Sequence, residues 1–230
     1  MVVYVLGGLV ATVAGVLLWS RARRPDRTVR DALAAAAATP LQFFPDGAVG
    51  RVSGTLVLDG EPLQAPLTGR ACAAYEVLVE RLVETGVGER WVRAAHHWDV
   101  RPFALDDTTG RAYVDPKGAL LTIVNDHHTL SGFESEPDER QAAFLETVDA
   151  READLLGSEP RLRYREGVLE PGERVALRGR GRVSHDDTAD ASLYRGVPRV
   201  RVDFRSEKSA KLFISDDLAG LADPAADDPA

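Results

Sequence analysis

The stretch LQAPLTGRACAAYEVLVE, Leu63–Glu80, combines a turn signal with a strand pattern. Pro66 and Gly69 mark the turn, and the residues that follow alternate as in a β-strand, where successive side chains point to opposite faces. One face of this strand would carry Ala71, Ala73, Tyr75, Val77 and Val79. The stretch therefore predicts a chain organised around short strands and turns.

The same stretch holds Cys72, the only cysteine of the chain. A catalytic or metal-bound thiol usually works beside a histidine or further cysteines, and neither lies near Cys72 in the sequence. We therefore predict a small side chain packed inside a strand. A single cysteine also excludes an internal disulfide and a zinc site built from several cysteines.

The composition is typical of an acidic globular protein. The 230 residues are 44% hydrophobic and 28% charged, enough apolar content for a packed core. The formal net charge of −8 should repel nucleic acid, so no nucleic-acid partner is predicted. The local run RGRGR, Arg178–Arg182, is interpreted as a solvated strand edge.

The N-terminal segment has the features of a membrane anchor. Val2–Trp19 carries no charge and is at the short end of what spans a bilayer as a helix. Several arginines follow in WSRARRPDR, and positive residues stay on the cytoplasmic side. We predict a transmembrane anchor over residues 1–20 that contacts the lipid bilayer through Val2–Trp19. The protein would be single-pass, with its N-terminus outside and its soluble domain cytoplasmic. A cleaved signal peptide is the alternative, although no basic residue precedes the apolar core.

The remaining chain is predicted to be mainly β, a β-rich α+β domain built as a barrel or as packed sheets. Residues 21–45 form a basic flank and an alanine-rich helix, about Thr28–Ala38, which either spaces the domain from the membrane or packs on it. Residues 46–216 hold the strands, with a helical insertion at about 138–157 where the apolar period changes. Residues 217–230 are acidic and rich in Ala and Pro, which predicts a solvated tail.

Few residues suggest catalysis. The sequence lacks the nucleophile motif G-x-S-x-G, a phosphate-binding loop and a dinucleotide fingerprint, so neither catalytic residues nor cofactors are predicted. Two pairs, His96-His97 and His127-His128, could bind a metal with Asp99 or Asp126. Adjacent strand residues point to opposite faces, so each pair offers at most one ligand. A metal-dependent hydrolase is therefore an alternative function.

Three segments, in order over residues 50–215, resemble the membrane-associated domain of the mulan or GIDE family of mitochondrial ubiquitin ligases, a domain also found in bacterial and archaeal proteins. They are VSGTLVLDGEPLQAPLTGRACAAYEVLVE, PFALDDTTGRAYVDPKGA and RLRYREGVLEPGERVALRGRGRV. The matched positions are Gly54, Pro66, Gly69, Arg70, Cys72, Tyr75, Asp106, Gly110, Asp115, Pro116, Arg165, Glu166 and Gly172.

The resemblance implies a recognition domain beside a membrane, with a protein partner that it does not identify. Eukaryotic members carry a zinc-binding RING that recruits the ubiquitin-conjugating enzyme. One cysteine cannot ligate a RING, so the resemblance implies a non-catalytic scaffold here, or a ligase-like protein that acts with a separate RING partner.

The matched residues also have mechanical interpretations. Gly54 and Gly69 suit tight turns or close backbone approach, and Gly172 supplies a positive φ after a proline. Pro66 would fix the beginning of its turn. A structural ion pair or a binding surface is expected from Arg70, Arg165 and Glu166.

Overall fold

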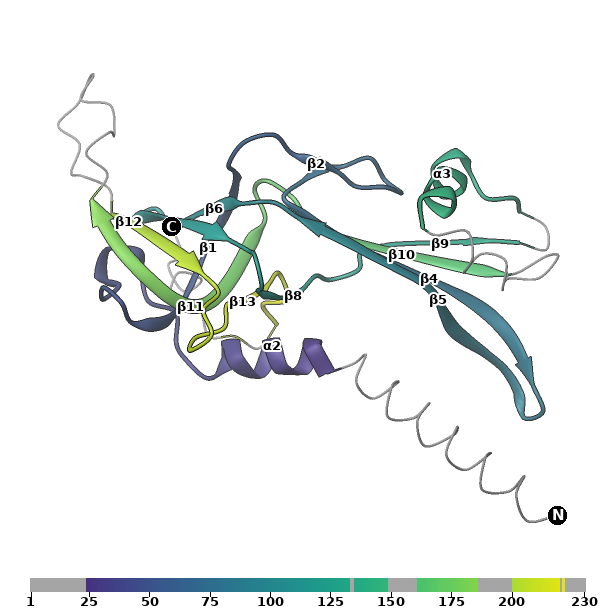
Figure 1. The fold of residues 1–230 in the computed structure, drawn as a ribbon, viewed down its shortest axis with the longest axis horizontal. Helices are drawn as coiled ribbons and strands as arrows, with labels where there is room; N and C mark the ends of the chain where they lie inside the picture. Colours follow the sequence, from purple (N-terminus) through teal and green to yellow (C-terminus); the bar gives the residue numbers. More distant parts are fainter. Residues whose placement is uncertain (1–23, 133–134, 149–160, 186–199, 220, 222–230) are drawn as a thin grey trace, which may run out of the picture.

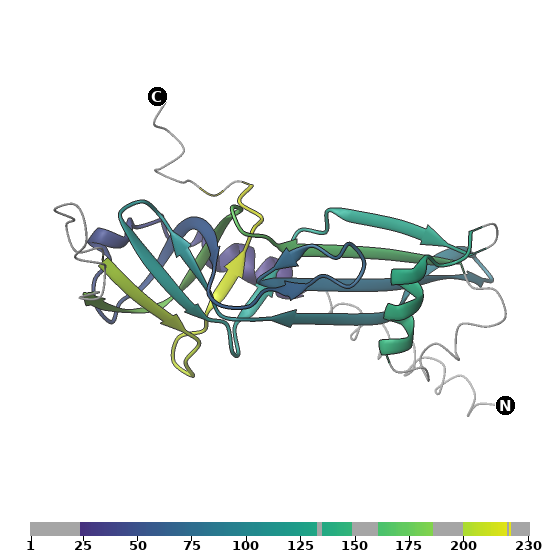
Figure 2. The ribbon, with the colours of Figure 1, turned by 90° about the horizontal axis from the view of Figure 1, so that it is seen from above.

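The computed structural model describes residues 24–132, 135–148, 161–185, 200–219 and 221, and the chain is mainly β. One sheet forms a closed five-stranded barrel from β1 (Val49–Leu58), β6 (Phe103–Asp106), β7 (Gly110–Asp115), β11 (Arg174–His185) and β12 (Val200–Arg205). A second, four-stranded sheet, here the distal sheet, consists of β4 (Ala74–Thr85), β5 (Gly88–Val100), β9 (His127–Ser131) and β10 (Leu162–Leu169). Figures 1 and 2 show the barrel at one end and the distal sheet extending away from it. The predicted β-rich fold is thus confirmed.

The barrel has a Greek-key order. Its strands run β1-β6-β7-β12-β11, and β11 pairs back with β1 to close the circle. Only β7 and β12 are parallel; the other barrel pairs are antiparallel. OB-folds are also five-stranded Greek-key barrels, although partly open ones. Two short strands, β8 (Leu120–Thr122) and β13 (Phe213–Ser215), extend the barrel sheet from β11.

The distal sheet is assembled from two insertions in the barrel. The chain leaves the barrel after β1, forms β2 (Leu63–Gln64), β3 (Ala71–Cys72), β4 and β5, and returns at β6. It leaves again after β7 and returns at β11, forming β9 and β10 on the way. The order β5-β4-β10-β9 places β4 of the first insertion beside β10 of the second. Segments that are far apart in the sequence therefore hold this sheet together.

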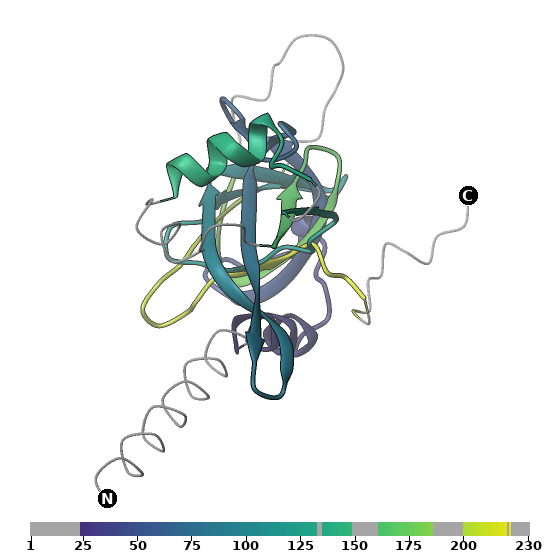
Figure 3. The same cartoon turned by 90° about the vertical axis from the view of Figure 1, so that its right-hand side faces the viewer.

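Each part has its own apolar core. The barrel core includes Phe103, Leu105, Leu177 and Phe204, all essentially inaccessible to solvent. The core of the distal sheet includes Val77, Val79, Tyr164 and Phe144. Phe144 comes from helix α3 (Glu139–Thr147), which lies across one face of the sheet (Figures 2 and 3). Its capping box, formed by Asp138 and Gln141, explains why the helix begins there.

The alanine-rich segment packs on the barrel. Helix α2 covers Arg24–Ala34, so the predicted limits of about Thr28–Ala38 were too far along the chain. Its apolar face consists of the larger side chains Val29 and Leu33, which lie against Ala176. These two residues are four apart and share one face of a helix. Of the two alternatives, packing on the domain is the one observed.

The 3-10 turn η1 (Leu41–Phe43) lies in the segment that connects α2 to the first barrel strand, β1. Phe44 follows it and meets Phe204 edge to face, with ring centroids 5.2 Å apart. Leu41 is also part of the barrel core. The segment between α2 and β1 therefore belongs to the folded domain.

The predicted domain boundaries can be compared with the structure only where it describes the chain. Helix α3 ends at Thr147, and the remainder of the predicted insertion, residues 149–157, lies outside the described residues. The domain does not stop at residue 216, because Asp217 pairs with Arg30 and both Leu218 and Leu221 pack beside α2. The rest of the predicted tail, residues 222–230, is outside the described part of the chain.

The predicted membrane anchor, residues 1–20, also lies outside the described residues. Within residues 24–132 and the later described ranges, no helix has the length and apolar character needed to cross a membrane.

The interpretation of RGRGR as a strand edge was wrong. Strand β11 is central: it pairs with β1 through Arg174–Arg180 and with β12 through Arg180–His185. A Cβ at Gly181 would lie 2.5 Å from the Phe44 ring and one at Gly179 would lie 2.7 Å from Leu212. The glycines are needed because the barrel core approaches the backbone closely at these points.

Gly110 offers a test of the same constraint. A Cβ there would lie 2.6 Å from the backbone oxygen of Val200, in the parallel pair β7–β12. We expect Gly110→Ala to lower the free energy of unfolding by about 1–3 kcal/mol through overpacking, measured by urea denaturation. Gly86→Ala is the control, because nothing lies within 4 Å of a Cβ at Gly86. Equal stabilities of the two variants would contradict this explanation.

Candidate functional site

The turn of the opening stretch forms a closed loop between β2 and β3. The amide of Ala65 donates to the Arg70 carbonyl at 2.9 Å, and the amide of Gly69 donates to the Ala65 carbonyl at 2.8 Å. Gly69 has φ 71°, in the left-handed region that favours glycine. The guanidinium of Arg140, from α3, lies over Gly69, 2.6 Å from where a Cβ would be. The positive φ is the reason for glycine here, and the flexible end of the Arg140 side chain fills the space that the missing Cβ leaves.

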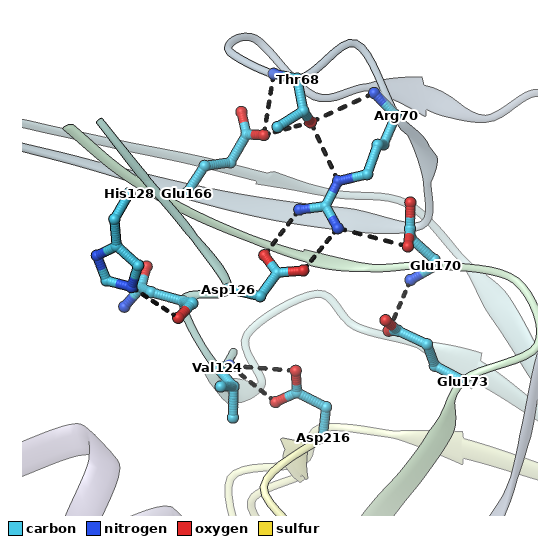
Figure 4. Close-up of polar contacts among 10 residues, drawn as sticks. Thr68, Arg70, Val124, Asp126, His128, Glu166, Glu170, Glu173 and Asp216 are labelled. Carbon is cyan, nitrogen blue, oxygen red and sulfur yellow. Dashed lines mark hydrogen bonds and ion pairs between the residues drawn. The ribbon is translucent and has the colours of Figure 1, made fainter. Parts of the chain in front are cut away.

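Glu166 of β10 holds this loop from below (Figure 4). Its carboxylate is fully buried and accepts hydrogen bonds from the amides of Leu67, at 2.7 Å, and Thr68, at 3.1 Å. The Thr68 hydroxyl donates to the same carboxylate. Three donors within one turn compensate a charge that would otherwise be costly to bury.

Arg70 joins the loop to the second insertion. Its two terminal nitrogens bind both oxygens of Asp126, at 2.6 and 2.7 Å, and its Nε donates to the Thr68 hydroxyl at 3.1 Å (Figure 4). Glu170 lies 3.5 Å away on the other side. The hydrogen bond with Asp126 raises the pKa of Arg70 and lowers that of Asp126. Both groups are thus held in their charged forms.

A fourth carboxylate lies at the junction between the distal sheet and the barrel. Asp216, just after β13, accepts from the amide of Val124 with both oxygens, at 2.9 and 3.1 Å. Burial raises the pKa of Asp216 to about 6. The pKa of Glu173 is also raised by burial, and its carboxylate accepts from the amide of Glu170 at 2.9 Å. We call Thr68, Arg70, Asp126, Glu166, Glu170, Glu173 and Asp216 the junction network.

Cys72 lies inside the core of the distal sheet, as the sequence predicts. The side chain is fully buried, and its thiol faces the Leu63 carbonyl at 3.8 Å. Burial raises the pKa of Cys72 to about 11, so very little thiolate exists at neutral pH. Both features argue against a nucleophilic role.

A pocket of about 470 Å³ opens beside the loop. Its floor is aromatic: Tyr75 stacks on His97, with ring centroids 5.8 Å apart, and His97 meets Phe144 edge to face at 6.1 Å. The Tyr75 hydroxyl and His97 Nδ1 share a hydrogen bond of 3.3 Å. The remaining wall consists of Pro66 and of one side of α3, namely Glu139, Arg140, Ala143 and Thr147. Such a mixture of aromatic floor and charged rim suits the binding of an amphipathic group.

Several motif residues come together here and others do not. Pro66, Gly69, Arg70, Cys72, Tyr75 and Glu166 belong to the loop, the network or the pocket. Arg165 points to the opposite face of the distal sheet, where it pairs with Glu80 at 2.6 Å, so the expected ion pair with Glu166 or Arg70 is not formed.

The remaining motif residues serve the barrel. Gly54 approaches the Asp106 carbonyl, 2.9 Å from a Cβ position. Asp106 pairs with Arg111 at 3.2 Å, and Asp115 accepts from the Lys117 amide at 3.1 Å in the turn that follows β7. Pro116 closes the same turn by accepting from the amide of Ala119 at 2.9 Å, and Gly172 has φ 92° between β10 and β11. These residues therefore have structural roles in turns and close contacts, and their presence in the motif needs no catalytic explanation.

The paired histidines do not converge. Register places His127, Glu166, Val77 and His97 in one row across the distal sheet, from one edge to the other. Three strand spacings separate the two histidines by about 14 Å, too far for one metal ion. His128 and His96 lie in the adjacent row with the same separation. Within the described residues, no group of three or more His, Cys, Asp or Glu side chains could hold a metal.

Other residues of the site were missed or misread in the sequence. Asp126 was considered only as a metal ligand and proves to be the partner of Arg70. Glu170, Asp216 and Thr68 carried no signal of their own, because their partners lie far along the chain. His97 and Phe144 meet only after α3 has packed on the sheet.

Comparison with protein-family models gives no match for this chain, and neither does comparison with curated proteins.

The buried carboxylate gives a stability prediction. Glu166→Gln leaves one oxygen to accept from the loop and turns an amide group toward the other donors. We expect a loss of about 2 kcal/mol in the free energy of unfolding, typical of hydrogen bonds to a charged group. Glu61→Gln is the control, because the Glu61 side chain is 89% exposed. Urea denaturation of both variants decides: an unchanged midpoint for Glu166→Gln would show that the loop does not depend on this charge.

Asp216 gives a prediction for pH dependence. Its pKa is about 6 in the folded state, above the unfolded value near 4, so the native state binds this proton more tightly. Stability relative to Asp216→Asn should therefore fall as the pH rises from about 4 to 6 and stay level above that. Asp126→Asn should show the opposite sign, because Arg70 lowers the pKa of Asp126 and its stabilisation is lost on acidification. Thermal unfolding of the three proteins from pH 2 to 8 measures both, because the Asp126 contribution is lost below about pH 4. Asp216→Asn and Asp126→Asn curves that run parallel to that of the unchanged protein would contradict the assignment.

Proposed function

We propose that this chain is a membrane-tethered, non-catalytic recognition module, of the kind that its resemblance to the mulan or GIDE membrane-associated domain implies. One observation carries the proposal: the most distinctive stretch of the sequence contributes to the lining of a pocket. Pro66 and Tyr75 line the pocket, and Arg140 of α3 lies over Gly69. The motif thus shapes a binding surface.

The charged motif residues support recognition over catalysis. Glu166 is saturated by donors from the loop, and Arg70 is held by Asp126 and Thr68. A general acid or base needs a proton that it can exchange with a substrate, and these side chains are committed to internal bonds. They make the loop rigid, and rigidity reduces the entropy lost when a partner binds.

The tether rests on the sequence. The uncharged run Val2–Trp19 is followed by arginines and then by α2, which packs on the barrel through Val29 and Leu33. If Val2–Trp19 spans the bilayer, the folded domain is held within a few residues of the membrane surface. A module in this position would meet partners in the plane of the membrane at raised effective concentration.

The tether can be tested directly. The full chain should remain with membranes after alkaline carbonate extraction, and a version lacking residues 2–19 should be soluble and keep the same thermal unfolding midpoint. Fractionation followed by immunoblotting measures the first result, and circular dichroism the second. Release of the full chain by carbonate would contradict a spanning anchor.

The recognition role of the pocket needs an experiment separate from the test of the membrane anchor. A photo-crosslinking amino acid at Thr147, on the pocket rim, should capture a defined protein from the membrane in which the full chain resides. The same group at exposed Glu61, which does not line the pocket, is the control. Adducts that are equal at both positions, or absent from both, would contradict a recognition role for the pocket.

A further inference from the structure

Strand β5 is an edge strand of the distal sheet, and within its C-terminal half the Val100 amide already donates to the Asp99 carboxylate at 2.8 Å. It is first in the order β5-β4-β10-β9, and among the described residues only β4 pairs with it. An edge strand presents backbone N–H and C=O groups that another strand can bind. Such an edge is the site of β-strand addition in many peptide-recognition domains.

One part of this edge is regular. A register shift occurs at Val79/Glu80 of β4, opposite the middle of β5, and beyond it the β4–β5 hairpin bends away from the sheet (Figures 1 and 3). From Ala95 to Val100 the pairing with β4 is uninterrupted. A bulge commonly limits how far a second strand can pair along an edge. The available segment is therefore Ala95–Val100.

The pocket lies beside this same segment. His97 is at its centre and forms part of the pocket floor, while Tyr75 and Phe144 complete the floor from β4 and α3. On the opposite face, Trp98 is 56% exposed. A strand added along Ala95–Val100 would direct alternate side chains toward the pocket and toward Trp98.

We propose that an extended segment of a partner protein adds to β5 along Ala95–Val100 and places an aromatic or branched apolar side chain in the pocket. The proposal rests on the recognition function above and gives it a partner class. Main-chain hydrogen bonds to the edge supply affinity, and the aromatic floor supplies side-chain specificity. The charged rim of Glu139 and Arg140 selects polar residues on either side of the apolar one.

A second copy of this chain fits the pocket less well. Residues opposite each other in a ladder share a face, so a copy of β5 would offer the pocket only Ala95, His97 or Asp99. None of these is a large apolar side chain. The occupant is therefore assigned to a different protein.

The test uses random seven-residue peptides displayed on phage and selected against the full chain in detergent micelles. A selected peptide is then synthesised and its Kd measured by fluorescence anisotropy. Methylating its backbone nitrogens one at a time should weaken binding about 10-fold or more at alternate positions and have little effect at those between, because only every second amide faces the edge.

Two neighbouring alanines of α3 supply matched protein variants. Ala143 lines the pocket and Ala142 does not, and both are exposed on the helix. Ala143→Trp should fill the pocket and raise the Kd about 10-fold or more, whereas Ala142→Trp should leave it within about 2-fold.

Three results would overturn strand addition: failure to select any peptide, N-methylation without an alternating effect, or equal effects of the two tryptophans. The methylation series needs no protein variant, so it decides even if Ala143→Trp unfolds the chain. A dimer in light scattering that selected peptides dissociate would assign the edge to a second copy and also reject the proposal. The recognition function would survive these results if crosslinking at Thr147 still captured a membrane partner.

Discussion

The buried carboxylate of Glu166 is the interaction on which the arrangement of loop, sheet and pocket depends. It lies on β10 and accepts from Leu67, 99 residues earlier in the chain. Without these bonds the loop between β2 and β3 would have two unpaired amides near the core of the distal sheet. These hydrogen bonds fix the position of the loop relative to β10, and Pro66 thereby lines the pocket.

The same constraint joins the two insertions of the barrel. Glu166 belongs to the second insertion and the loop to the first, and Arg70 adds a bidentate pair from the loop to Asp126. Close backbone packing continues this junction: a Cβ at Gly167 would lie 2.5 Å from the carbonyl of Val124, whose amide binds Asp216. The distal sheet is thus fixed to the barrel by polar bonds as well as by strand connections.

This construction is consistent with the proposed recognition function. Most of the charged groups of the junction network are engaged in internal hydrogen bonds, and the surface of the distal sheet offers a partly aromatic pocket, the exposed Trp98 and an edge strand. Many peptide-recognition domains bind an extended peptide at an exposed sheet edge, with pockets for alternate side chains. The contrast between internally bonded charged groups and an accessible pocket and strand edge supports both the proposed function and the proposed partner class.

Much of the fold could be predicted from sequence, because it depends on local patterns. Alternation after Gly69 indicated strands, the turn at Gly172 needed a positive φ, and the buried Cys72 had no reactive neighbour in sequence. The predicted faces were wrong, because the strand is broken at Ala73 and Cys72 therefore shares a core with Tyr75 instead of lying opposite it. Helix limits were less accurate: α2 is set by the contacts of Val29 and Leu33 with the barrel, which an alanine count does not contain. The central place of β11 was also hidden, because arginines that alternate with glycines have the composition of an exposed edge.

The amino-acid sequence by itself determined that this chain is β-rich, acidic and poor in catalytic motifs, and which residues bend its turns. These are properties of residue type and near-neighbour spacing. Only the tertiary structure decided that Arg70 meets Asp126, that Glu166 binds the loop, and that the histidine pairs lie at opposite edges of one sheet. Those outcomes depend on strand order between two distant insertions, and strand order is decided by which apolar faces can be buried together.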